Sequence, residues 1–171
     1  MSRIAIGSRV GLGTASLHHL NRFNQRIGLL EAAYDAGIRY FDTAPLYGHE
    51  SAERVLGRFV RKHQSRTNLV VATKIGLVPN ALVCTMPQLL LPYVALRTLS
   101  SRLGVLPAAN WHPRRDFSAA YLLSRVERSL RVMGLDRLDI VYLHEPRIEE
   151  LHHVNVIAEA AVKLRMRGLV R

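Results

Sequence analysis

The strongest constraint on the fold is the stretch of residues 37–57, which reads as a strand, a polar loop and a helix in direct succession. Residues 38–41 are β-branched or aromatic and predict a short buried strand, and Asp42 follows where that strand leaves the core. A proline and a glycine then mark a turn, which places Tyr47 on a loop beyond the strand end. Residues 50–61 show the apolar spacing of an amphipathic helix.

Two later stretches repeat this arrangement of an apolar strand followed by a polar residue. Residues 69–73 are apolar and lead into Lys74, and residues 138–143 lead into His144. In a parallel barrel the carboxyl ends of the strands share one face, which is where active sites are built. The sequence therefore predicts that the lysine and the histidine meet the aspartate and tyrosine of the first unit.

Four motifs carry a resemblance to a known family: GLGTA at residues 11–15, the whole of residues 37–57, ATKIG at 72–76 and GLDRLDIVYLHEP at 134–146. Together they resemble the aldo-keto reductases, oxidoreductases on a (β/α)₈ TIM barrel that use a nicotinamide cofactor. DFS at residues 116–118 and the HEP after the fourth strand are most similar to the bacterial aldose-dehydrogenase-like branch. The resemblance implies a catalytic tetrad of Asp42, Tyr47, Lys74 and His144, with NADP(H) or NAD(H) as cofactor and Asp42 beside it.

The chain length bears on how much of a barrel is present. The sequence has 171 residues, whereas a complete eight-stranded barrel needs about 250. Residues 168–171 have the pattern of an opening fifth strand. We therefore expect a single partial domain over residues 1–171, an incomplete barrel of the first four βα units plus the start of the fifth strand.

Residues 76–117 interrupt the alternation of strand and helix and are predicted to be an insertion after the third strand. The run of residues 75–96 carries no charged side chain and has the length of a membrane span. Prolines at positions 79, 87 and 92 would interrupt such a helix repeatedly. We therefore expect short helical pieces over the mouth of the barrel and no membrane span, although flanking arginines leave a peripheral membrane contact open.

The formal net charge of +11 comes from 24 basic residues against 13 acids. Such an excess attracts nucleic acid in some proteins, but here arginines such as Arg125 and Arg128 are scattered over helix faces without interleaved aromatic residues. We therefore read them as solvated and do not expect a nucleic-acid partner. The single cysteine, Cys84, excludes an intrachain disulfide and fits a reducing compartment, so the expected location is the cytoplasm.

The four site residues have the chemistry that carbonyl reduction requires. The developing alkoxide needs a proton, which a tyrosine with its ordinary pKa near 10 releases slowly unless a cation favours the phenolate. Lys74 would supply that cation, Asp42 would keep the lysine charged and aimed, and His144 would donate a hydrogen bond to the substrate oxygen. The hydride has to come from the cofactor. Taken singly, each residue also has an ordinary structural explanation, and only their joint placement favours the tetrad.

The resemblance implies that most cofactor contacts come from the fifth to eighth strands, so this chain alone is not expected to hold the cofactor. Our leading hypothesis is an oxidoreductase that transfers hydride between a nicotinamide and a small carbonyl or sugar substrate, with Tyr47 as proton donor. The alternative is a truncated, non-catalytic half-barrel that needs a partner or the remaining strands. Its open sheet edges would favour self-association.

Overall fold

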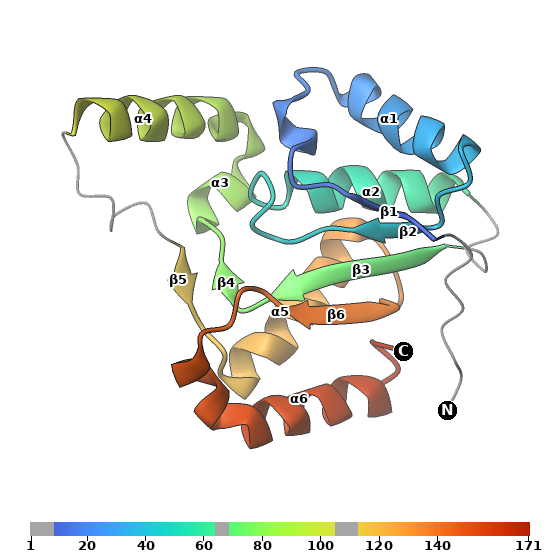
Figure 1. The fold of residues 1–171 in the computed structure, drawn as a ribbon, viewed down its shortest axis with the longest axis vertical. Helices are drawn as coiled ribbons and strands as arrows, with labels where there is room; N and C mark the ends of the chain where they lie inside the picture. The colour runs from blue at the N-terminus through green and yellow to red at the C-terminus, as the bar shows by residue number, and fades with distance from the viewer. Residues whose placement is uncertain (1–8, 64–68, 105–112) are drawn as a thin grey trace.

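The computed structural model describes residues 9–63, 69–104 and 113–171 (Figure 1). Its main sheet has four parallel strands in the order β1-β2-β3-β6. The strands are β1 (Gly11–Gly13), β2 (Tyr40–Asp42), β3 (Val70–Ile75) and β6 (Ile140–Leu143). Beyond them, Leu138 forms an isolated parallel bridge with Val170, and the Arg171 amide donates to the Leu138 carbonyl at 3.0 Å. The predicted opening of a fifth strand is therefore confirmed, and with it the partial barrel.

Four helices cover one face of this sheet and pack on one another in sequence order. They are α1 (Phe23–Asp35), α2 (Ser51–Lys62), α5 (Ala119–Met133) and α6 (Val154–Met166), with short 3₁₀ turns η1 (Leu17–His19) and η5 (Ile148–His153). Phe41 and Val71 of the sheet are fully buried against Phe59 of α2, and the two phenyl rings lie 5.1 Å apart. The core thus lies between the sheet and its outer helices, as in the wall of a barrel.

Local capping chemistry sets both ends of helix α5. The Ser118 hydroxyl accepts a hydrogen bond from the Tyr121 amide, and Gly134 ends the helix in the left-handed conformation with φ of 64°. Asparagine is a favoured capping residue, but Asn24 does not cap α1. The helix starts at Phe23, where the Gln25 side chain accepts a hydrogen bond from the Arg22 amide, so Asn24 lies inside the first turn.

Segment 76–117 lies between the third and fourth strands of the main sheet, and its residues 105–112 lie outside the described part. It enters and leaves through an antiparallel pair, β4 (Leu77–Val78) and β5 (Arg114–Arg115). Between them lie α3 (Ala81–Thr85), the 3₁₀ turn η3 (Pro87–Leu89) and α4 (Leu90–Leu103). Helix α4 is longer than the prolines predicted, because Pro92 falls in its first turn, where the missing N–H has no intrahelical partner to lose.

No helix in the described residues is long and apolar enough to cross a membrane. Helices α3 and α4 divide the uncharged run that had the length of a span, and Met86 separates α3 from the 3₁₀ turn that precedes α4. The interruption falls at Pro87, whereas Pro92 lies inside the first turn of α4.

No helix of the described residues covers the second face of the sheet (Figure 1). Its side chains include Tyr40 and Tyr142, whose hydroxyl oxygens are 3.2 Å apart, and Tyr142 is 43% exposed. Because side chains alternate between the two faces of a strand, Lys74 and Asp42 project from the same face. In a closed barrel this face would line the interior.

Candidate active site

The four predicted site residues lie along one edge of the parallel sheet. Asp42 is the last residue of β2, and His144 directly follows β6. Lys74, which was expected at or just past the end of its strand, is the penultimate residue of β3. Tyr47 lies on the loop between β2 and α2, where its amide donates to the Ala44 carbonyl at 3.0 Å. The parallel order brings all of these positions to the carboxyl ends of the strands.

The side chains of these residues are in contact with one another. The Lys74 ammonium donates to Asp42 Oδ2 and lies 4.9 Å from the centre of the Tyr47 ring. The Tyr47 and His144 rings meet edge to face, with centres 5.7 Å apart and planes at 86°. The structure thus brings all four predicted residues into one cluster.

The environment of Lys74 keeps its amine protonated. Burial would lower the pKa of Lys74, but hydrogen bonds with Asp42 and Tyr47 outweigh that effect, and its pKa lies above the ordinary value. Only 20% of the lysine side chain and 21% of the aspartate side chain are exposed, so solvent screens the pair incompletely. A fixed positive charge therefore lies beside the Tyr47 phenol.

His144 is held in its neutral form. Burial lowers the pKa of its imidazole and outweighs the opposing effect of the Glu145 charge, while the charge of Lys74 lowers the pKa further. The residue is 6% exposed, and its amide donates to the Ile75 carbonyl at 2.7 Å. Its Nδ1 atom is buried without a partner in the described part. A neutral imidazole in this position can donate one hydrogen bond to a substrate oxygen.

The loop that carries Tyr47 ends in three consecutive residues with positive φ. These are Gly48, His49 and Glu50, with φ of 57°, 47° and 71°. Left-handed backbone costs a non-glycine residue about 1–2 kcal/mol, so contacts elsewhere have to hold His49 and Glu50 in place. The Glu50 amide donates to the Pro45 carbonyl at 2.7 Å, which closes the loop on itself.

The Glu50 side chain is fully buried and accepts hydrogen bonds from three arginines. Arg125 Nη1 and Arg128 Nε donate to its Oε1 at 2.7 and 2.6 Å, and Arg54 Nη2 lies 3.3 Å from Oε2. Burial alone would raise the pKa of Glu50, but the bonds from Arg128 and Arg125 outweigh it, and the pKa lies below the ordinary value. The carboxylate therefore stays charged and anchors the tyrosine loop to α5.

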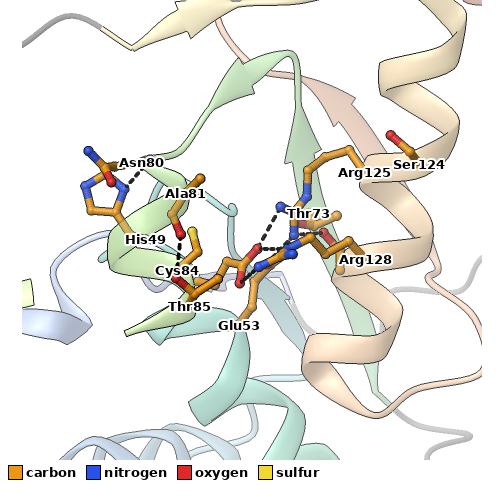
Figure 2. A network of polar contacts seen from close by, with 12 residues as sticks. His49, Glu53, Thr73, Asn80, Ala81, Cys84, Thr85, Ser124, Arg125 and Arg128 are labelled. Atoms are coloured by element: carbon orange, nitrogen blue, oxygen red, sulfur yellow. Dashed lines mark hydrogen bonds and ion pairs between the residues drawn. The ribbon is translucent and has the colours of Figure 1, made fainter. Parts of the chain in front are cut away.

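A second buried carboxylate joins this network from the next turn of α2. Thr73 Oγ1 donates to Glu53 Oε1 at 3.0 Å, and Arg125 Nη2 lies 3.6 Å from Oε2 (Figure 2). Thr73 immediately precedes Lys74 in β3. We call Glu50, Glu53, Arg125 and Arg128 the acid–arginine cluster, and it connects the tyrosine loop, the lysine strand and α5.

The interpretation of Arg125 as a solvated residue was wrong, because its side chain is only 5% exposed. The helical spacing of α5 nevertheless indicated that Arg125 is buried. Arg125 follows Leu122 by three positions and precedes Ser129 by four, so it shares the buried face of α5 with both. Its partners on α2 are remote in sequence, and for that reason the pattern alone did not reveal the cluster.

Comparison with protein-family models matches residues 9–171 to the aldo/keto reductase family. Among curated proteins, a D-threo-aldose 1-dehydrogenase from a Pseudomonas species is 34% identical over 95% of this chain, and a pyridoxal 4-dehydrogenase from Microbacterium luteolum is 32% identical over 80%. The aligned parts are 47% and 39% of those two proteins. The chain thus spans less than half the length of these relatives.

Solved structures with the same fold include the holo form of an aldo-keto reductase from Bacillus halodurans. It superposes with a TM-score of 0.69 at 23% identity, over 95% of this chain and 43% of that one. A putative aldo-keto reductase from Pseudomonas aeruginosa gives a TM-score of 0.67 at 26% identity, over 95% and 52% respectively. The described strands and helices correspond to about half of each barrel.

Proposed function

The chain belongs to the aldo/keto reductase family, and we propose that it carries the catalytic residues of an oxidoreductase acting on a carbonyl or sugar substrate. The observation that supports this most directly is the contact of the Lys74 ammonium with both Asp42 and the face of the Tyr47 ring. A cation fixed at that distance stabilises a phenolate, and this is what a tyrosine acid requires.

In the proposed reduction, the nicotinamide nucleotide that the family generally uses supplies the hydride to the carbonyl carbon. Tyr47 gives its hydroxyl proton to the carbonyl oxygen, and the negative charge left on the phenolate is balanced by Lys74. His144, as a neutral donor, orients the carbonyl oxygen towards the tyrosine. Oxidation of an alcohol runs the same steps in reverse, with the Tyr47 phenolate accepting the proton.

One atom of the site fits the family's cofactor. Asp42 Oδ1 is buried and has no donor among the described residues, while Oδ2 is occupied by Lys74. A buried carboxylate oxygen without a donor is costly, and a hydroxyl group of a nicotinamide ribose would satisfy it. We therefore assign Asp42 a second role beside the cofactor, with NADP(H) or NAD(H) as the candidates.

The substrate class follows from the relatives. Two of them are named for the oxidation of an aldose and of pyridoxal. We propose a small carbonyl or sugar compound for this chain as well.

The single cysteine, Cys84, is buried, which raises the pKa of its thiol to about 12 and leaves it unreactive. We propose a cytoplasmic location because a single cysteine, which forms no intrachain disulfide, fits a reducing compartment.

The variant Lys74→Met tests this function in the full-length protein, by which we mean a chain that also carries the remaining barrel strands. We expect kcat to fall by about 10–100-fold, because a charged hydrogen-bonding group contributes roughly 1.5–3 kcal/mol. Lys163→Met, an exposed change on α6, is the matched control and should leave turnover unchanged. Reduction of an aldehyde is followed by the loss of nicotinamide absorbance. Equal kcat values for the two variants would contradict the assigned role of Lys74.

The alternative function, a half-barrel that works only with a partner, is favoured by the exposed inner face that carries Tyr142. An unpaired parallel edge beside that face promotes association. We therefore expect the purified 171-residue chain to sediment as a dimer or larger species. A stable monomer that resists proteolysis would argue against an obligatory partner.

A further inference from the structure

A cavity of about 440 Å³ opens beside the candidate active site. Its wall includes Leu46 and Glu145, which are the chain neighbours of Tyr47 and His144. Segment 76–117 lines the same cavity with Tyr93 and Arg97 of α4 and with Arg114 at the start of β5. The volume lies within the range of about 300–1,000 Å³ that is usual for small-molecule sites. The cavity is thus placed to hold the part of a substrate beyond its carbonyl group.

Two arginines give this cavity its charge. Arg97 of α4 and Arg114 of β5 both line it, against one acid, Glu145. Arg97 forms no ion pair within the described part of the chain. Arg114 lies 3.4 Å from Asp116, but its side chain is 71% exposed, and such surface pairs contribute little. Two positive charges and one negative leave the wall with an excess of one positive charge.

Two contacts join the tyrosine loop to segment 76–117, which carries Arg97 and Arg114. His49 Nδ1 accepts a hydrogen bond from the Asn80 amide at 3.0 Å, a contact visible in Figure 2. The His49 ring also meets the Tyr93 ring edge to face at 4.9 Å. Arg97 follows Tyr93 by four positions and therefore lies on the same side of α4. Burial lowers the pKa of His49, and the charge of Arg97 lowers it further, so the imidazole adds no charge of its own.

From this geometry we infer that the site takes a carbonyl or sugar substrate that carries an anionic group, a carboxylate or a phosphate, held by Arg97 and Arg114. The inference rests on the proposed function, because the reacting carbonyl is placed at Tyr47. The guanidinium groups match the geometry of carboxylate and phosphate oxygens. Tyr93 and His49 offer ring surfaces against which the carbon skeleton can pack.

The test compares three substrates of one carbon skeleton in the full-length protein: a neutral aldose, its uronate and its terminal phosphate ester. We expect kcat/KM to be higher for the anionic compounds than for the neutral one. The change Arg97→Gln should reduce kcat/KM for the anionic compounds by about 10–100-fold, as loss of a charged hydrogen bond would. The neutral aldose should be affected by no more than about twofold, because it lacks the paired charge. Arg114→Gln should act in the same direction.

The matched control is Arg102→Gln, an exposed change on the same helix at a residue that does not line the cavity. It should leave all three values unchanged. A preference for the uronate over the phosphate, or the reverse, identifies the anion. Equal use of neutral and anionic substrates, or an equal loss on all three in Arg97→Gln, would overturn the inference while leaving the proposed function intact. No turnover of any carbonyl substrate would overturn the proposed function itself.

Discussion

Replacing Tyr47 by phenylalanine should lower kcat in the full-length protein by about 10²–10⁴-fold, the usual contribution of a positioned acid or base. The variant keeps the ring that packs edge to face on His144 and removes only the hydroxyl. Substrate binding should therefore change little, and the loss should fall on kcat more than on KM. Steady-state turnover of an aldehyde with each nicotinamide cofactor measures both constants.

Tyr34→Phe is the matched control for this change. Tyr34 lies on α1, where its ring meets Phe59 and the Arg39 guanidinium, away from the carboxyl edge of the sheet. The same loss of a hydroxyl there should leave kcat unchanged. If Tyr47→Phe kept normal turnover, another group would have to supply the proton and the tetrad would lose its acid.

Replacing Arg125 by methionine should destabilise the fold by about 3–5 kcal/mol, the typical cost of removing one partner from a buried ion pair. The variant leaves two buried carboxylates, Glu50 and Glu53, with less compensating charge. Urea unfolding followed by circular dichroism measures the effect. Arg131→Met, an exposed change on the same helix, should lie within about 0.5 kcal/mol of the parent protein.

The pH dependence of Arg125→Met separates an electrostatic origin from a packing defect. Burial already raises the pKa of Glu53 in the parent, and the charge of Arg125 opposes that rise. Without the arginine, the folded-state pKa should rise further above the unfolded value of 4.5. The cost is then largest above the folded-state pKa of the variant and shrinks as the pH falls through it, and it is lost below 4.5, where the carboxyl group is protonated in both the folded and the unfolded state. A deficit that does not change with pH would indicate lost packing instead.

The sequence predicted most of the elements that position the site. Apolar strands followed by polar residues placed Asp42 and His144 correctly, because parallel strands leave little freedom at their carboxyl ends. Ser118 and Gly134 defined α5 through local capping chemistry. Lys74 also lies at the carboxyl end of its strand, where the ladder with β6 carries β3 one residue further, to Ile75.

The features that the sequence did not reveal depend on contacts between distant segments. Glu50 has a left-handed backbone conformation and is fully buried, and glutamate rarely adopts either state. Both are possible here because arginines of α5 bind its carboxylate. Arg125 was read as solvated for the same reason, since its partners lie on α2. The extent of α4 was underestimated because proline was treated as an interruption wherever it occurs.

The short pair formed by β4 and β5 places the two ends of segment 76–117 side by side, with Leu77 opposite Arg115. A loop whose ends are already joined can be lengthened, shortened or exchanged at small entropic cost. The β4–β5 pair therefore fixes both ends of the segment, so the part between these two strands can change in length at small entropic cost.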